Sequence, residues 1–170
     1  GNYKDSRHPE KVEFTGNLAL DLARRDFTVN ALAYNPKDGL VDLYGGIRDI
    51  NLKTVRCIGE PAARFDEDAL RILRALRFSA KLDFDIESNT AEALKDKSKL
   101  LEKISAERIT AEISKLFESP FPERLGKILS DFKDVFSLVI PEIENSENYD
   151  EICLKTSLVP PENNLRMIYF

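Results

Sequence analysis

The sequence predicts an α+β fold in which short strands and helices precede an all-helical region. Up to about residue 60, short apolar runs with β-branched residues alternate with turn signals, the strongest of which covers residues 35–39. Beyond Pro61, apolar residues recur every three or four positions. This change of period divides the chain into a few-stranded sheet with short helices and a helical part.

The first sixty residues are expected to form a small sheet. The turn signal in residues 35–39 should join two antiparallel strands, because it combines Asn, Pro, Asp and Gly between two apolar runs. The predicted elements are a strand around Val12 and Phe14, a helix over residues 18–25, and strands over residues 27–34, 40–43 and 53–58.

The remaining sequence predicts four helices, over about residues 62–81, 88–97, 105–117 and 121–131. One face of the first is apolar and should be buried; it consists of Ala69, Ile72, Leu73, Leu76 and Ala80. The opposite face carries Arg64, Asp68, Arg71, Ala75 and Phe78. The sequence pattern changes near Pro61 and is interrupted again near Pro120, which suggests domains over residues 1–60, 61–119 and 120–170.

The composition is that of a globular protein without a membrane partner. The 170 residues are 42% hydrophobic and 32% charged, with a net charge of −5. No apolar run approaches the roughly 18 residues of a membrane span. Cys57 and Cys153 lack metal-ligand spacing, so we expect reduced thiols in a cytoplasmic protein. The oligomeric state is left open.

Asp68 and Arg71, one helical turn apart, have two interpretations. They can form an ordinary surface ion pair. Alternatively, a carboxylate beside a guanidinium complements the edge of cytosine or adenine, which offers an amine donor beside a ring-nitrogen acceptor, and it clashes with uracil and guanine. The basic residues on the same helix suit either a phosphate-bearing partner or a solvated face.

Four motifs in this order resemble those of the bacterial class II tRNA nucleotidyltransferases and their poly(A) polymerase relatives. The matching segments are residues 23–32 (ARRDFTVNAL), 42–50 (DLYGGIRDI), 64–71 (RFDEDALR) and 105–109 (SAERI) with Glu112 and Lys115. The resemblance implies the downstream half of a nucleotidyltransferase head, a helical neck and the start of a helical body. It also implies a Gly-Ser loop and an Asp-x-Asp pair of Mg²⁺ ligands upstream of Gly1, so residues 1–170 alone are expected to be inactive.

By the same resemblance, the chain holds nucleotide-binding residues but no catalytic residue and no metal ligand. Asp68 and Arg71 would recognise the base and Glu67 would support them. Arg24 and Arg25 would hold the triphosphate, Asp26 would orient these arginines, and Asn30 would lie near the ribose. The segment with Asp42, Gly45, Gly46 and Asp49 would act as a hinge; it can equally be a simple turn and helix cap. Four charged residues would brace the neck, namely Glu107, Arg108, Glu112 and Lys115.

The implied activity is protein-templated addition of CMP and AMP, from CTP and ATP, to the 3′ end of tRNA or another RNA. Addition of A alone, or poly(A) synthesis, remains an alternative because the Asp68 and Arg71 pair suits both C and A. A non-catalytic RNA- or nucleotide-binding helical module is another. Asp83 and Asp85 have the spacing of a metal-binding pair, but the family layout places them in a loop between neck helices, so we do not expect a metal there.

Overall fold

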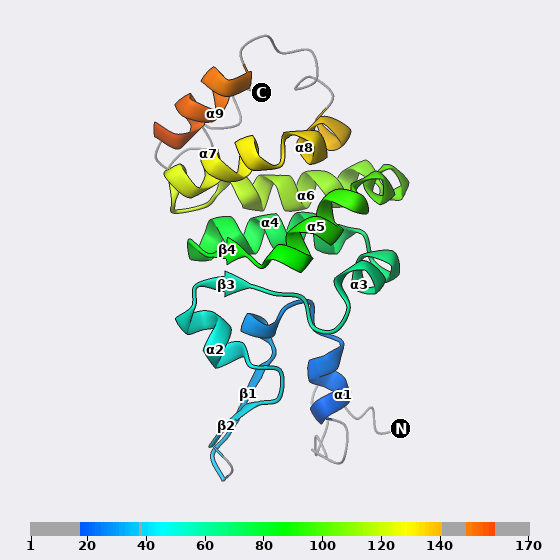
Figure 1. Ribbon diagram of the computed structural model, residues 1–170, viewed down its shortest axis with the longest axis vertical. Coiled ribbons are helices and arrows are strands. Elements are labelled where there is room, and N and C mark those ends of the chain that lie inside the picture. Colours follow the sequence, from blue (N-terminus) through cyan, green and yellow to red (C-terminus); the bar gives the residue numbers. More distant parts are fainter. Residues whose placement is uncertain (1–17, 38, 141–148, 159–170) are drawn as a thin grey trace, which may run out of the picture.

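The computed structural model describes residues 18–37, 39–140 and 149–158. Figure 1 shows an elongated chain with α1 and the β1–β2 hairpin at one end, α9 at the other, and the remaining helices stacked between them. The strand expected around Val12 and Phe14 lies outside the described residues. None of the described helices is long and apolar enough to cross a bilayer.

The elements before Pro61 are short. They are α1 (Leu18–Ala23), the 3₁₀ helix η1 (Thr28–Asn30), β1 (Leu32–Asn35), β2 (Gly39–Asp42), α2 (Gly46–Asn51) and β3 (Thr54–Val55). From Pro61 on, helices dominate. They are α3 (Pro61–Glu67), α4 (Leu70–Leu82), α5 (Ser88–Asp96), the 3₁₀ helix η2 (Ser98–Lys103), α6 (Ala106–Phe117), α7 (Pro122–Asp131), α8 (Lys133–Val139) and α9 (Tyr149–Leu158), with the short strand β4 (Asp85–Ile86) after α4.

The predicted hairpin is confirmed, but its first strand is shorter than predicted. β1 and β2 pair antiparallel, with Leu32 opposite Asp42. The strand expected over residues 27–34 is wrong in its first half, where η1 forms instead. The reason is local: the Asn30 side chain accepts a hydrogen bond from the Phe27 backbone N–H at 3.2 Å, which favours a turn over an extended strand. Phe27 keeps a single bridge to Cys57.

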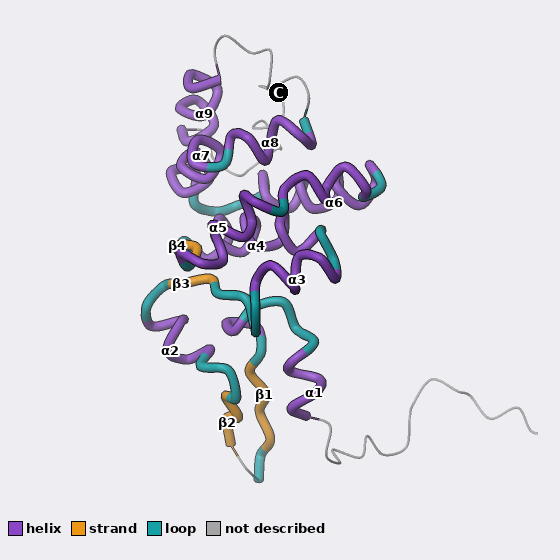
Figure 2. Tube along the Cα trace, turned by 45° about the vertical axis from the view of Figure 1, so that its right-hand side comes forward, coloured by secondary structure: helices purple, strands orange, loops and turns teal. Residues whose placement is uncertain are grey.

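The third predicted strand is also short, and its partner comes from beyond α4. β3 pairs in parallel with β4, with Thr54 opposite Asp85, and Figure 2 shows these two strands adjoining where the lower part of the molecule meets the helices. The sequence analysis did not predict β4. The small sheet therefore connects residues before Pro61 directly with residues after α4.

The helix predicted over residues 62–81 is in fact two helices, α3 and α4, separated at Asp68 and Ala69. Asp68 has extended backbone angles (φ −150°, ψ 101°), and its carboxylate accepts a hydrogen bond from the Leu70 N–H at 3.2 Å. An aspartate that binds the backbone two residues later competes with helix continuation. The expectation that Asp68 and Arg71 share one continuous helix is wrong for this reason.

Both faces of α4 are covered. Its predicted apolar stripe is confirmed, since Ala69, Ile72, Leu73, Leu76 and Ala80 are all buried. The opposite face is not open: Ala75 is buried as well, and the Phe78 ring meets the Phe27 ring edge-on, with centroids 5.5 Å apart. One face of α4 thus packs among the helices, and the other packs against the segment that follows α1.

The main hydrophobic core crosses the junction near residue 60. Phe27, Val55 and Cys57 belong to the same buried cluster as the α4 residues and as Val135 and Phe136 of α8. Leu22, Ala31 and Ile58 form a smaller cluster beneath α1. Because one core joins the segments on both sides of the junction, the polar residues of α3 and α4 are held against the loop after α1.

Candidate functional site

The loop after α1 presents two neighbouring arginines at the surface. The Arg24 side chain is 78% exposed and donates to Asp21 at 3.0 Å. Arg25 donates to the Asn30 carbonyl oxygen at 2.8 Å. Such exposed contacts stabilise little, so both guanidiniums can exchange their present partners for an anion.

Arg64 of α3 holds the main chain of this loop. Its guanidinium donates to the carbonyl oxygens of Arg24 and Arg25 at 3.2 and 2.7 Å, and to Glu67 at 2.6 Å. An open cavity of about 510 Å³ is lined by Leu20, Ala23, Arg24 and Arg64. Arg24, one of the two predicted phosphate-binding arginines, therefore lines an open cavity that α3 helps to shape.

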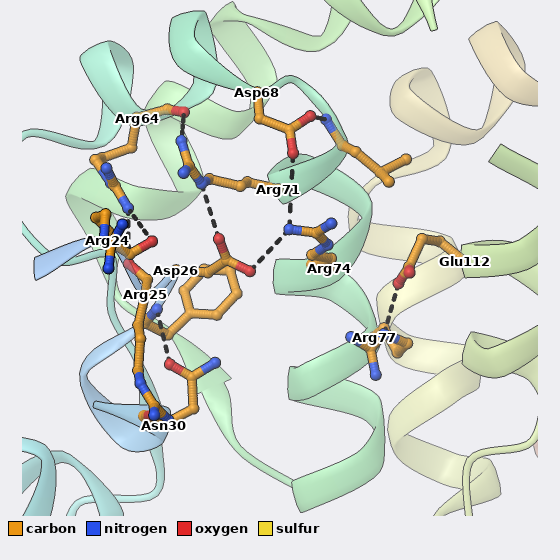
Figure 3. A network of polar contacts seen from close by, with 12 residues as sticks. Arg24, Arg25, Asp26, Asn30, Arg64, Asp68, Arg71, Arg74, Arg77 and Glu112 are labelled. Atoms are coloured by element: carbon orange, nitrogen blue, oxygen red, sulfur yellow. Dashed lines mark hydrogen bonds and ion pairs between the residues drawn. The ribbon is translucent and has the colours of Figure 1, made fainter. Parts of the chain in front are cut away.

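Asp26 occupies the centre of a group that we call the arginine–carboxylate cluster (Asp26, Glu67, Asp68, Arg71 and Arg74). Its carboxylate accepts hydrogen bonds from Arg71 Nε at 2.8 Å and from an Arg74 terminal nitrogen at 3.0 Å. Figure 3 shows Asp26 between these two arginines. The family resemblance implied that Asp26 orients Arg24 and Arg25; in the structure, the Asp26 carboxylate pairs instead with Arg71 and Arg74 of α4.

Arg71 is the most enclosed member of the cluster, with its side chain 12% exposed. Besides Asp26, it contacts Glu67 and the Arg64 carbonyl oxygen, each at 2.8 Å. Burial lowers the pKa of the guanidinium, but the hydrogen bonds and charges of Asp26 and Glu67 outweigh burial and raise the pKa above its ordinary value. Arg71 is therefore a fixed, permanently charged donor.

Asp68 turns to different neighbours from those of Arg71. Its carboxylate accepts from the Leu70 N–H, lies 3.7 Å from an Arg74 nitrogen, and meets Arg108 of α6 at 3.4 and 3.5 Å. The side chain is 26% exposed. The two residues predicted to recognise a base are thus not paired with each other, and they are linked through Asp26 and Arg74 (Figure 3).

Three residues that were not predicted to belong to the site contact it in the structure. Arg64, Arg74 and Arg108 all contact predicted site residues, yet Arg64 and Arg74 were treated only as part of a basic face and Arg108 as a brace. A signal for Arg74 existed: it lies three residues after Arg71 and therefore on the same side of α4. No short-range pattern pointed to the pairing of Arg64 with backbone carbonyls.

Of the four predicted bracing residues, Glu112 makes a direct contact between α4 and α6. Its buried carboxylate lies 2.7 Å from Arg77 Nε and 3.4 Å from Lys115, and the Arg77 guanidinium also covers the Phe78 ring at 4.7 Å. Figure 3 places this pair one turn further along α4 than Arg74. Glu107 is exposed.

The predicted hinge residues form a helix cap and a tightly packed start of α2. Asp42 accepts from the Gly46 and Ile47 N–H groups at 2.8 and 2.9 Å; burial raises the pKa of its carboxyl, but these backbone donors lower it to a net value below the ordinary one. Gly45 has φ +76°, which favours glycine. A Cβ on Gly46 would lie 2.3 Å from the Thr28 carbonyl oxygen. Buried Asp49 accepts from Thr28 and Arg56 at 2.7 and 3.1 Å.

Asp83 and Asp85 both pair with Arg124 of α7, and we call these three residues the Arg124 cluster. Hydrogen bonds from Arg124 lower the pKa of each carboxyl below its ordinary value, despite partial burial. Within the described ranges, no group of three or more His, Cys, Asp or Glu residues is arranged to hold a metal ion.

Comparison with known proteins identifies the family. Residues 1–56 match the protein-family model described as the poly A polymerase head domain. Residues 83–146 match the family model described as the probable RNA and SrmB-binding site of polymerase A. The CCA-adding enzyme of Streptococcus gordonii is 51% identical over 119 residues, which is 70% of this chain and 30% of that enzyme. The chain belongs to the tRNA nucleotidyltransferase and poly(A) polymerase family.

Solved structures of this family have the same fold. The Bacillus stearothermophilus CCA-adding enzyme in complex with CTP superimposes with a TM-score of 0.70 at 34% identity, over 82% of this chain and 34% of that one. The Thermotoga maritima CCA-adding enzyme complexed with tRNA gives 0.69 at 35% identity, over 79% and 34%. This chain thus spans about a third of the length of the family members that it matches.

Proposed function

We propose that this chain is the nucleotide-selecting part of a CCA-adding enzyme, which adds CMP and AMP from CTP and ATP to the 3′ end of tRNA. The observation that carries the proposal is the contact between the loop after α1 and the α3–α4 break. This contact brings the surface arginines Arg24 and Arg25 close to the arginine–carboxylate cluster. The names of the matched relatives support the same activity.

The base would be recognised by Asp68 and Arg71. Asp68 accepts from the exocyclic amine of cytosine or adenine after releasing Arg108, whose contacts of 3.4 and 3.5 Å are long for hydrogen bonds. Among the described residues, Arg71 uses Nε and one terminal nitrogen, which leaves its other terminal nitrogen to donate to the ring nitrogen. Glu67 keeps the guanidinium in place through its contact at 2.8 Å.

The triphosphate would bind Arg24 and Arg25, whose guanidiniums can each hold phosphate oxygens bidentately. Asn30, tied to both Arg25 and Phe27, would lie near the ribose. Gly45 would allow the segment from Asp42 to Asp49 to bend, while Gly46 and Asp49 keep its packing against Thr28. Mg²⁺, bound outside the described residues, would neutralise phosphate charge in the cytoplasm, where tRNA is processed.

Nucleotide binding by the purified chain tests the proposal. Dissociation constants for ATP and CTP should be lower than those for GTP and UTP. In Arg71→Ala, ATP and CTP should lose roughly ten- to a hundredfold in affinity relative to GTP and UTP, because one charged hydrogen bond is worth about 1.5–3 kcal/mol. Arg77→Ala, which breaks the pair with Glu112, is the control for a general loss of stability. Equal affinities for all four nucleotides in wild type and Arg71→Ala would refute the proposal.

The choice between CCA addition and addition of A alone is tested with a protein that spans the full length of the matched relatives and contains this chain. Extension of tRNA ending before CCA, with CTP alone and then ATP alone, separates the two. Incorporation of C followed by A supports CCA addition, whereas incorporation of A only supports an A-adding enzyme or a poly(A) polymerase.

A second candidate function is an RNA-binding helical module without catalysis. The match of residues 83–146 to a probable RNA-binding model favours it. Tight binding of a tRNA by the chain, without preference among the four nucleotides, would support this candidate over the first.

A further inference from the structure

Arg74 connects two carboxylates of the arginine–carboxylate cluster, those of Asp26 and Asp68. One terminal nitrogen of its guanidinium is 3.0 Å from Asp26 and 3.7 Å from Asp68. These aspartates come from different segments, the loop after α1 and the α3–α4 break. Figure 3 shows Arg74 directed between them.

Each carboxylate has one further cationic partner in the described part of the chain. Asp26 pairs with Arg71 and Asp68 pairs with Arg108. Neither Arg71 nor Arg108 has a recorded contact with both aspartates, whereas Arg74 has. The contacts therefore run in one line, from Asp68 to Arg74, from Arg74 to Asp26, and from Asp26 to Arg71.

This line of contacts links the Asp68 side chain to that of Arg71 across a break in the helix. The two residues belong to different backbone segments, because α3 ends before Asp68 and α4 begins after it. Without Arg74, the Asp68 side chain would keep the Leu70 N–H and the contacts to Arg108 at 3.4 and 3.5 Å, but it would lose its link to Asp26 and, through Asp26, to Arg71. It would also face Asp26 without a cation between the two negative charges, and like charges repel.

We propose that Arg74 is a positioning residue for nucleotide selection, which holds the Asp68 carboxylate at the distance and angle from Arg71 that cytosine and adenine require. The inference rests on the proposed function, since it concerns the same site. Arg74 itself does not touch the nucleotide. Its side chain is 27% exposed and both of its recorded partners are protein carboxylates, so its effect on selection passes through Asp68 and Asp26.

Arg74→Gln and Arg74→Lys, compared with Arg77→Gln, test this inference. Arg77 lies one turn further along α4 and its recorded acidic partner is Glu112, so its removal loosens the packing of α4 against α6 without touching either aspartate. For each protein, the dissociation constants of ATP, CTP, GTP and UTP are measured, together with the melting temperature.

We expect Arg74→Gln to reduce the ratio of the GTP to the CTP dissociation constant by about tenfold or more, because misplaced polar groups no longer match the base edge. Arg74→Lys should retain part of the ratio, since a lysine keeps one charged nitrogen that can lie between the two carboxylates but lacks the planar guanidinium that fixes its direction. Arg77→Gln should lower the melting temperature and keep the ratio.

A ratio that survives in Arg74→Gln, or one that falls equally in Arg77→Gln, would overturn the inference and leave the proposed function standing. A wild-type chain that binds all four nucleotides equally would overturn the proposed function, and the inference with it.

Discussion

Helix α4 has an ion-pair cluster at each end, and the two clusters differ in what they connect. At its beginning, the arginine–carboxylate cluster joins the loop after α1 to α3 and α4. At its end, the Arg124 cluster joins α7 to Asp83, which caps α4, and to β4. The first cluster spans the junction near residue 60, whereas the three residues of the second all follow it, and Asp83 meets Lys53, which precedes the junction, only at 3.6 Å.

This difference distinguishes the Arg124 cluster, which stabilises the fold, from the arginine–carboxylate cluster, which is the candidate site. The two carboxylates of the Arg124 cluster both pair with one arginine, which fixes the turn between α4 and β4 against α7. In the first cluster, Arg71 and Arg74 of α4 alternate with Asp26 and Asp68, which lie outside α4, in one line of contacts. Asp68 has one further partner, Arg108, which a ligand can replace. We therefore expect changes in the first cluster to alter both stability and nucleotide selection, and changes in the second to alter stability alone.

Asp26→Ala should have the largest effect. It removes the shared acceptor of Arg71 and Arg74, whose guanidiniums are mostly buried. Loss of one partner of a buried pair is strongly destabilising, so we expect the free energy of unfolding to fall by about 2–3 kcal/mol and the preference for CTP over GTP to weaken. Urea denaturation and nucleotide titration measure the two effects. Asp21→Ala, at an exposed pair, should change stability by less than about 0.5 kcal/mol; equal losses in both variants would contradict the expectation.

Arg124→Ala should have a smaller effect, confined to stability. Asp83 and Asp85 would keep Lys53 and Lys127, each at 3.6 Å. Because both carboxylates are substantially exposed, the loss should be about 1 kcal/mol. The nucleotide dissociation constants should not change. A shift in the ratio of GTP to CTP binding in this variant would remove the distinction between the two clusters.

The pH dependence of stability sharpens the same distinction. Hydrogen bonds from Arg124 hold the pKa of Asp83 and of Asp85 below the ordinary value. A lowered folded-state pKa stabilises the protein above the unfolded-state pKa of about 3.9, and this stabilisation is lost as the pH falls through the folded-state value. Between about pH 5 and pH 2, the free energy of unfolding should therefore fall more steeply in wild type than in Arg124→Gln. Parallel curves from acid titration of the two proteins would show that the pairs contribute nothing.

The sequence predicted the helical part of the fold well, because burial follows the 3.6-residue period. Ala69, Ile72 and Leu76 were predicted to be buried and are, and the predicted helices over residues 88–97, 105–117 and 121–131 correspond to α5, α6 and α7. The break at Asp68 was not predicted, because the apolar period continues across it. The hydrogen bond from the Leu70 N–H to the Asp68 side chain does not change the spacing of the apolar residues, so the spacing cannot reveal it.

The candidate site was predictable in its membership but not in its pairing. The family resemblance named Asp26, Glu67, Asp68 and Arg71, and the structure brings these residues together. The sequence could not show that Arg71 pairs with Asp26, because these residues are 45 positions apart and only tertiary packing brings them into contact. For Asp68, helical spacing favoured Arg71 as the partner, whereas the break turns its carboxylate toward Arg74 and Arg108.

Arg108→Gln should have the smallest effect on stability and an effect on binding opposite to that of Arg74→Gln. The Arg108 side chain is 51% exposed and its contacts to Asp68 are long, so the free energy of unfolding should change by less than about 0.5 kcal/mol. Because a base amine and Arg108 compete for the same carboxylate, removing Arg108 should tighten CTP binding about two- to fivefold, the equivalent of one exposed ion pair. Titration with CTP measures the change. Weaker CTP binding would mean that Arg108 holds Asp68 in its binding orientation, so that α6 would have to be counted as part of the site.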